Sequence, residues 1–316
     1  MRWLRWALWL VVVVGLLLAA IGGYVWFVSE SMLTATHDVP AARIPSPWPM
    51  KILDADPLGI GKSIARSNAR KRGEALSVRL GCRECHGQDL GGKVVMDVGP
   101  VMRLAAPNLT HGHGGLPEGY GIVDFERMVR HGVRRDGGTA LMSSIDYQAL
   151  SDREVSDLYV VVEDLDPVDR DVGPSSWGPV MRALYAFGQV PALSAHRIDP
   201  DRKDLETPPP HRPDARFGEH LAQTCVGCHN PHFSGGRVLD GDPDWPPAAN
   251  LTPAPDGLGG WTKEQFVTLM RTGIRPDGRA VDPVAMPWKA VGTADDVELE
   301  AIWVYLRSLS PRGTGE

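Results

Sequence analysis

Cys82-Arg83-Glu84-Cys85-His86 decides the fold of this chain, and Cys225-Val226-Gly227-Cys228-His229 repeats the same pattern in its second half. Two cysteines two residues apart, followed at once by a histidine, are typical of a site of c-type haem attachment. The spacing suits the chemistry, because two thiols add to the vinyl groups on one porphyrin edge and the short loop places the next imidazole under the iron. The sequence therefore predicts two covalently bound haem c groups, with attachment through Cys82, Cys85, Cys225 and Cys228 and with His86 and His229 as proximal iron ligands.

A redox-active dithiol and half of a zinc site are the other common uses of a Cys-x-x-Cys pair. Neither pair has a further cysteine or a spaced histidine pair close by to complete a zinc site of the usual pattern. The surroundings also lack the βαβ pattern of a redox dithiol. The two motifs use all four cysteines of the chain, so haem attachment at both accounts for every one of them.

The residues around the two motifs also repeat, which indicates two similar units, called the first and the second repeat below. A Gly-Glu-x-Leu sequence precedes each motif, starting at Gly73 and at Gly218. An Asn-Leu-Thr sequence follows each motif, starting at Asn108 and at Asn250. Asn-Leu-Thr matches the acceptor pattern for N-glycosylation, but its recurrence at the same place favours a loop motif of the repeat.

Each repeat is predicted to begin and to end with a helix. The helix before the first motif is expected to start near Lys62. The closing helices are expected at about 152–164 and 295–308, because their apolar residues recur at i, i+3, i+4 and i+7. Ser151-Asp152 and Thr293-Ala294-Asp295 supply N-cap residues, and the apolar face of each closing helix can pack on the helix before the motif.

The sixth ligand of each iron decides between electron transfer and ligand chemistry. Met142 lies 56 residues after His86, and Met286 lies 57 residues after His229. A single methionine is more often core filler, but the matching positions predict Met142 and Met286 as the distal ligands. Other candidates for the first repeat are Met96, Met102, Met128 and His131. The remaining histidines are expected to be solvated: His37, His111, His113, His196, His211, His220 and His232.

From Trp6 to Val28 no residue is charged, and at about 1.5 Å per residue this run is long enough to cross a bilayer as a helix. A cleavable signal peptide is the alternative, but its apolar region is usually only about 7–15 residues long. Arg2 and Arg5 place the N-terminus in the cytoplasm. The predicted location is the bacterial inner membrane, crossed once, with everything after Glu30 in the periplasm.

The net charge of the chain is −6, and removing the two positive charges of Arg2 and Arg5 leaves −8 for the rest. Nucleic-acid binding would need a basic stripe, so no nucleic-acid partner is expected. The 35 glycines and 27 prolines indicate a loop-rich protein in which a large cofactor supplies much of the core.

The predicted order is a transmembrane anchor, 1–30, an extended tether, 31–69, a first cytochrome c-like domain, 70–166, a Pro-rich linker, 167–212, and a second such domain, 213–311, giving a mainly α fold. The tether is expected to lift the first domain off the membrane. Within the linker, a short helix at about 178–188 is expected to pack against one domain or to brace the pair, with a membrane-surface position as the alternative.

With these features the chain resembles membrane-anchored dihaem c-type cytochromes, and its repeats are similar to the class I cytochrome c domains in cytochrome subunits of periplasmic dehydrogenases and terminal oxidases. Arg275-Pro276-Asp277-Gly278 and Met286-Pro287 belong to this resemblance, and the first repeat has altered forms at Arg135-Asp136-Gly137 and Met142-Ser143. The dehydrogenase subunits generally have three haems, whereas this chain has two motifs. The resemblance implies that the helices before and after each haem cross, and that the Asn-Leu-Thr loop runs near the haem.

The expected function is that of an electron-transfer protein and not an enzyme. Two irons with both axial positions filled leave no site for a substrate, so the chain is expected to relay single electrons. Its expected partners are a dehydrogenase or quinol-oxidising complex as donor and a cytochrome or oxidase as acceptor. The alternative is a dihaem peroxidase-like enzyme or a haem-based sensor, with an open iron in the first repeat.

Overall fold

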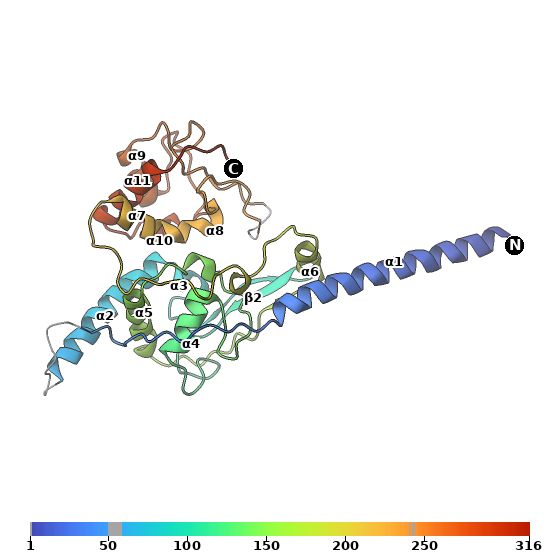
Figure 1. Cartoon of the computed structure of the whole chain (residues 1–316), viewed down its shortest axis with the longest axis horizontal. Helices are drawn as coiled ribbons and strands as arrows, with labels where there is room; N and C mark the ends of the chain where they lie inside the picture. Colours follow the sequence, from blue (N-terminus) through green and yellow to red (C-terminus); the bar gives the residue numbers. More distant parts are fainter. Residues whose placement is uncertain (1, 50–58, 240, 242–243) are drawn as a thin grey trace.

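The computed structural model describes residues 2–49, 59–239, 241 and 244–316, and over these residues the chain is mainly helical, as predicted (Figure 1). Its α-helices are α1 (Arg2–Leu33), α2 (Ile60–Arg79), α3 (Cys82–His86), α4 (Ile122–Glu126), α5 (Asp152–Glu163), α6 (Pro179–Ala186), α7 (Ala215–Ala222), α8 (Val226–His229), α9 (Lys263–Thr272), α10 (Trp288–Val291) and α11 (Asp296–Ser308). Short turns of other helix types are η1 (Arg127–His131), η2 (Ser144–Asp146), η3 (Ser194–His196) and η4 (Gln223–Cys225), and the strands are β1 (Lys93–Val98), β2 (Met102–Ala106) and β3 (Ser176–Trp177).

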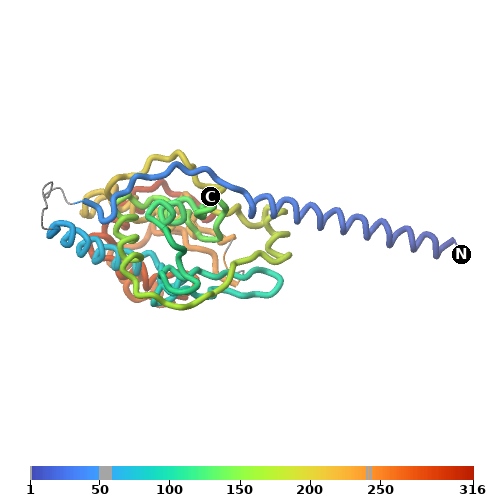
Figure 2. Tube along the Cα trace, turned by 90° about the horizontal axis from the view of Figure 1, so that it is seen from below, coloured from blue at the N-terminus to red at the C-terminus, as the bar shows by residue number. Residues whose placement is uncertain are grey.

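The apolar helix α1 projects from the rest of the described chain, which we call the head (Figures 1 and 2). Its side chains are mostly exposed as far as Phe27, whereas Ser29 and Met32 are buried against the head. Its most apolar stretch has a mean hydropathy of 2.5. A long apolar helix with no protein around it fits the predicted membrane span.

In the first repeat, α2 crosses the closing helix α5. Gly73 lies at the crossing, where an added Cβ would come 2.1 Å from the carbonyl oxygen of Asp157. The absence of a side chain therefore lets the two backbones approach. Side chains from both helices and from α4 form one buried cluster, which includes Leu76, Phe125 and Val155.

The second repeat has the same crossing, between α7 and the closing helix α11. An added Cβ at Gly218 would come 1.9 Å from the carbonyl oxygen of Ala301. Phe217, Phe266 and Leu299 belong to a separate buried cluster that draws only on this repeat. The Gly-Glu-x-Leu sequence before each motif thus marks the glycine at which two helices cross.

Both closing helices begin at a capping box, the arrangement in which the N-cap side chain and the third helical residue bond to each other's backbone amides. Ser151 and Glu154 form it in the first repeat. Asp295 and Glu298 form it in the second. The predicted N-cap segments are confirmed, and Asp295 is the residue that occupies the N-cap position in the second repeat.

The structure contains a small antiparallel sheet in the order β1-β2-β3. The sequence does not predict this sheet. β1 and β2 form a hairpin in which Val98 lies opposite Met102, and Met102 in turn lies opposite Trp177 of β3. Among the described residues, the second repeat has no such hairpin. The hairpin adds to the first repeat a surface without a counterpart in the described part of the second.

The segment predicted as an extended tether is extended over residues 35–49, but it is packed against the head. Val39 and Ile44 are buried, and the Pro45 carbonyl accepts a hydrogen bond from Ser156 of α5 at 2.7 Å. The remaining residues before α2 include 50–58, which lie outside the described residues. The described part of this segment is therefore an extended stretch packed on the surface of the first repeat (Figure 2).

The Pro-rich stretch after α5 also packs mainly on the first repeat. The carbonyl of Leu205 accepts a hydrogen bond from the amide of Asp152 at the start of α5, at 2.8 Å. The predicted short helix is present as α6, and it packs on α1 and on β3. It therefore braces the anchor and not the pair of repeats.

Candidate haem-attachment sites

The histidine of each motif is buried and held by a backbone carbonyl. His86 Nδ1 donates to Pro107 O at 2.8 Å, and His229 Nδ1 donates to Ala249 O at 2.7 Å. Because a carbonyl only accepts, the proton lies on Nδ1 and the Nε2 lone pair is available to a metal. Burial lowers the pKa of both histidines, so the neutral ring that binds iron is favoured. Both imidazoles therefore fit the role of proximal ligand.

The cysteines do not have the properties of a redox-active pair. Burial raises the pKa of Cys82 to about 11 and that of Cys225 to about 12, whereas a redox dithiol needs a lowered pKa. None of the four forms a disulfide. Among the described residues, the side chains grouped closely enough to hold a metal are Glu126, His131 and Asp204, without a cysteine. The dithiol and zinc alternatives therefore gain no support.

The Asn-Leu-Thr loops fix the carbonyls that orient these histidines. Asn108 directly follows Pro107 and is 1% exposed, and Asn250 directly follows Ala249 and is 4% exposed. Their Nδ2 atoms donate to carbonyls of the chain beyond each closing helix, at 2.6 Å and 2.7 Å. A buried asparagine cannot carry a glycan, so the loop interpretation is confirmed.

The backbone after each motif also follows one path in both repeats. The amide six residues after each motif histidine donates to that histidine's carbonyl, at 2.8 Å for His86 and 3.0 Å for His229. Leu90 and Phe233 occupy corresponding places and have positive φ angles of 56° and 59°. Positive φ is uncommon for residues other than glycine, so its recurrence indicates the same local structure at both motifs.

Met142 and Met286 precede the same turn of the backbone. The residue after Met142 is Ser143, with φ −74° and ψ 56°, and the residue after Met286 is Pro287, with φ −77° and ψ 53°. In both, the next amide donates back to the methionine carbonyl, at 2.8 Å and 2.7 Å, which makes an inverse γ-turn. Each methionine packs on the core of its own repeat. The missing proline has therefore not changed how Met142 is held.

The competing candidates in the first repeat belong to other elements, although the Met128 carbonyl accepts a hydrogen bond from the Ser144 hydroxyl at 2.7 Å. Met96 and Met102 belong to the β1–β2 hairpin, and Met128 and His131 belong to η1. His131 Nε2 lies 3.2 Å from the carboxylate of Glu126. Met142 stays the predicted sixth ligand of the first site.

The turn η2 lies between the two attachment motifs, a contact that the repeat pattern does not predict. On one side, the Tyr147 hydroxyl next to η2 donates to Leu80 O at 3.2 Å, two residues before Cys82. On the other side, Asp146 approaches the second motif so closely that a Cβ on Gly227 would lie 2.1 Å from its Oδ1. The segment from Ser144 to Tyr147, which continues directly from Met142, therefore contacts the second motif and the residues just before the first.

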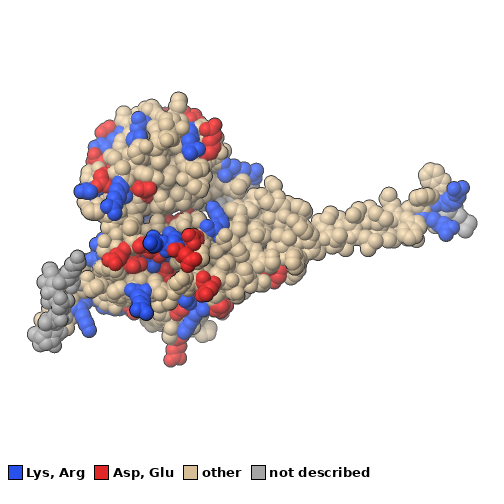
Figure 3. Space-filling model, in the orientation of Figure 1, with Lys and Arg blue, Asp and Glu red and all other residues tan. Residues whose placement is uncertain are grey.

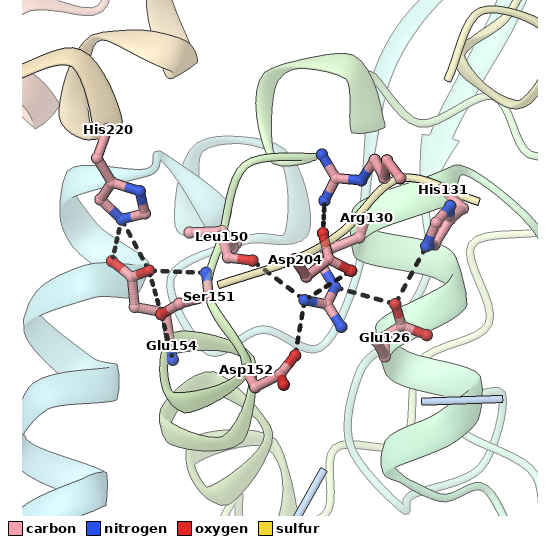
Figure 4. A network of polar contacts seen from close by, with 10 residues as sticks. Glu126, Arg130, His131, Leu150, Ser151, Asp152, Glu154, Asp204 and His220 are labelled. Atoms are coloured by element: carbon pink, nitrogen blue, oxygen red, sulfur yellow. Dashed lines mark hydrogen bonds and ion pairs between the residues drawn. The ribbon is translucent and has the colours of Figure 1, made fainter. Parts of the chain in front are cut away.

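A buried polar network fixes the start of α5 (Figure 4). Arg130 is 1% exposed and binds Glu126 at 2.9 Å, Asp152 at 2.9 Å and Asp204 at 3.1 Å. The corresponding Arg271 of the second repeat binds Asp296 at 2.8 Å. Arg202 also pairs with Asp204, so the described contacts of these carboxylates form an ion-pair network at the start of α5.

The capping-box glutamates each bind a residue of the other repeat. His220 Nε2 of α7 lies 2.9 Å from the Glu154 carboxylate, as Figure 4 shows, and Arg79 of α2 pairs with Glu298 of α11. The prediction that His220 is solvated is wrong, because the side chain is 6% exposed. His37 is half-buried and its ring packs edge to face on that of His196 at 4.7 Å, whereas His196 itself is exposed, as predicted. In both contacts the capping-box glutamate of one repeat binds a side chain on the helix before the motif of the other repeat.

No protein-family model matches the chain. It is 27% identical over 264 residues to the cytochrome subunit of fructose dehydrogenase from Gluconobacter japonicus, a match that covers 75% of this chain and 52% of the relative. It is 28% identical over 276 residues to the cytochrome c subunit of a quinone-linked alcohol dehydrogenase from Gluconacetobacter polyoxogenes, covering 75% and 55%. For the cytochrome c subunit of gluconate 2-dehydrogenase from Pantoea cypripedii the identity is 26%, covering 78% and 60%.

The chain therefore spans little more than half the length of these relatives. The homologues are cytochrome subunits of dehydrogenases, which is consistent with an electron-transfer subunit. The similarity extends over three quarters of this chain, so it is not limited to the short attachment motifs.

Proposed function

We propose that the chain is a membrane-tethered cytochrome c with two haem c groups that relays single electrons. Cys82 and Cys85 attach one haem, and Cys225 and Cys228 attach the other. His86 and Met142 hold the first iron, and His229 and Met286 hold the second. The observation that carries this proposal is the pairwise agreement between the repeats, in which a carbonyl orients each histidine and the same inverse γ-turn follows each methionine.

These residues suit an electron carrier. Haem c, when bound, supplies an iron that gains or loses one electron without a change of ligands. The carbonyl on Nδ1 fixes the ring and makes the histidine a stronger ligand. A methionine thioether favours ferrous iron and so raises the reduction potential. With both axial positions filled, the protein binds no substrate at iron, which distinguishes a carrier from an enzyme.

The contact between the motifs supports transfer within the chain. The Ser144–Tyr147 segment contacts the first motif through the chain before Cys82 and the second motif at Gly227. The two attachment motifs then lie on either side of this segment. With haem bound at both motifs, this proximity would allow an electron to pass from one repeat to the other within the chain.

The likeness to dehydrogenase subunits supports a dehydrogenase as electron donor, with a quinol-oxidising complex as the other class of donor and a cytochrome or oxidase as acceptor. The helix α1 crosses the bacterial inner membrane once. The repeats, as domains 70–166 and 213–311, stand in the periplasm, where c-type haem is attached, and the Pro-rich stretch 167–212 links them.

The iron ligands are tested by substitution in the purified holoprotein. We expect two haems per chain, and we expect Met142→Ala and Met286→Ala each to remove about half of the absorption band that arises from methionine bound to ferric iron. Met96→Ala is the matched control in the first repeat and leaves the band intact. A Met142→Ala protein with the full band contradicts the assignment of that ligand.

Carbon monoxide separates the carrier from the alternative enzyme or sensor. An open iron in the first repeat would bind the gas rapidly in the native, reduced protein. We expect slow and incomplete binding at both haems, because Met142 is held in the same way as Met286. Rapid saturation of one haem contradicts the proposal.

A further inference from the structure

Helix α6 packs on the last turns of the apolar part of α1. The Tyr24 hydroxyl donates to Ala186 O at 3.4 Å, and the rings of Tyr24 and Phe187 lie 6.2 Å apart. Arg182 stacks over the Trp26 ring at 4.2 Å and binds Glu30 at 2.7 Å. The position of α6 along α1 is therefore fixed between Tyr24 and Glu30.

The outer face of α6 is apolar and uncovered. Val180, Leu184 and Phe187 are 41%, 36% and 56% exposed. The helix has one charged residue, Arg182, and Glu30 neutralises it. In Figure 3, the side of the head next to α1 is mostly free of Lys, Arg, Asp and Glu. An apolar surface of this kind on a protein normally marks a contact with a partner or with lipid.

The tip of the β1–β2 hairpin lies beside α6 on this surface. The amide of Gly178 donates to Val101 O at 2.8 Å, and the amide of Val180 donates to Pro100 O at 3.0 Å. Val98, at the end of β1, is 48% exposed. Figure 2 shows that the hairpin and α6 both reach toward the side of the head from which α1 leaves.

The length of α1 places this surface at the edge of a bilayer. The hydrocarbon core of a bilayer needs about 20 helical residues. Counted from Trp6, the first residue after Arg5, those residues end close to Tyr24. The aromatic side chains of Tyr24, Trp26 and Phe27 suit the boundary between acyl chains and headgroups. Because α6 packs on this part of α1, it lies at the same depth.

We propose that the outer face of α6, together with the tip of the β1–β2 hairpin, lies in the interface of the bilayer that α1 crosses, so that Val180, Leu184 and Phe187 contact lipid. This inference uses the membrane anchoring proposed for α1 but does not depend on haem. The contact is apolar, because the charge of Arg182 is already paired with Glu30. It orients the first repeat, which contains the hairpin and on which the linker with α6 packs, toward the membrane.

The experiment uses the full-length holoprotein in phosphatidylcholine vesicles, with single cysteines that are labelled with a nitroxide. The test site is Phe187→Cys. One control is Val284→Cys, an exposed apolar position of the second repeat at 71% exposure, and the other is Leu17→Cys within α1. The unsubstituted protein, treated in the same way, gives the background. Electron paramagnetic resonance then compares collisions of each label with oxygen, which concentrates in the bilayer, and with a nickel chelate, which stays in water.

We expect the label at position 187 to have an oxygen-to-nickel ratio several times that at position 284 and close to that at position 17. A ratio at 187 equal to that at 284, with 17 in the bilayer, overturns this inference and leaves the anchor intact. That result would also be expected if the face binds a protein partner, since none is present in the vesicles. A label at 17 that is open to nickel overturns the anchor and this inference together, whereas the haem assignments stand on their own test.

The composition of the vesicles gives a second test. Replacing part of the phosphatidylcholine with anionic phosphatidylglycerol should leave the ratio at 187 unchanged. A large rise in that ratio would show attraction by charge, and would overturn the proposed apolar contact.

Discussion

The Nε2 atom of His220 lies 2.9 Å from the Glu154 carboxylate, although 66 residues separate the two in sequence and each belongs to a different repeat. Glu154 also completes the capping box of α5, with its carboxylate 2.9 Å from the Ser151 amide. One buried carboxylate therefore both starts a helix and holds the second repeat against the first. Glu298 likewise completes the capping box of α11 in the second repeat and binds Arg79 of the first repeat.

Removing the His220 side chain should destabilise the protein. We expect His220→Leu to lower the free energy of unfolding by about 2 kcal/mol, because it leaves a buried carboxylate with fewer partners. Chemical denaturation followed by circular dichroism measures the change. His211→Leu is the control, since His211 pairs with Asp295 at 2.7 Å but both side chains are more than half exposed, and it should cost less than about 1 kcal/mol. Equal losses would contradict a special role for His220.

The same carboxylate should make stability depend on acid pH. Burial by itself raises the pKa of Glu154, but hydrogen bonds and charge from His220, with hydrogen bonds from Ser151, outweigh it and lower the pKa overall. Its stabilising effect is then complete above the ordinary glutamate pKa of about 4.3 and is lost as the pH falls through the lower value of the folded state.

We expect the free energy of unfolding to fall below about pH 4, and Glu154→Gln to reduce that slope. Denaturation curves at a series of pH values measure it. Glu118→Gln, at an exposed position, should leave the slope unchanged. An acid slope that Glu154→Gln does not alter would mean that other carboxyl groups account for it.

The helix crossing in the second repeat should not tolerate a methyl group. We expect Gly218→Ala to cost about 2 kcal/mol, because the new Cβ would lie 1.9 Å from Ala301 O and one helix must move. Thermal or chemical unfolding measures this loss. Gly260→Ala is the matched control, since no heavy atom lies within 4 Å of a Cβ there. A stable Gly218→Ala protein would show that α7 and α11 do not cross so closely.

The shared turn after the two methionines predicts an unusual outcome for a proline substitution. Ser143 has a φ of −74°, which proline adopts without strain, so Ser143→Pro should keep or raise stability by up to about 1 kcal/mol and should keep the methionine-to-iron absorption band. Ser144→Pro should instead destabilise the protein, because it removes the hydrogen bond from the Ser144 amide to Met142 O. Loss of the band in Ser143→Pro alone would show that the two turns differ in the holoprotein.

Local patterns in the sequence predict those parts of the fold that repeat. The closing helices, their N-caps and the Asn-Leu-Thr loops are confirmed, because helical periodicity, capping residues and a motif present twice depend on nearby residues. The ligand methionines stay predictions, and they rest on spacing that agrees between the repeats. The turn at Ser143 has the same shape as that at Pro287, so backbone geometry is shared even where the sequence motif is altered.

The sequence predicts less where residues meet across the chain. Whether His220 is solvated or buried depends on Glu154, which lies in the other repeat, and a single sequence does not show which surfaces of two repeats touch. The β1–β2 hairpin has no copy in the part of the second repeat that the structure describes, so comparing the repeats cannot reveal it. The prolines of residues 35–49 predict an extended chain, but they do not predict which surface that chain packs on.

The residues at the end of α1 and directly after it are hydrogen-bonded to the head. The carbonyl of Met32 accepts a hydrogen bond from Thr139 at 3.2 Å and lies 2.9 Å from His196 Nε2, and the His37 amide donates to Gly137 O at 2.8 Å. If α1 spans a bilayer, these contacts leave no free linker directly after α1 that would let the head move relative to the membrane. A membrane-bound partner would then meet the head by diffusion of both proteins in the plane of the membrane, with the height of the head above the bilayer set by these contacts.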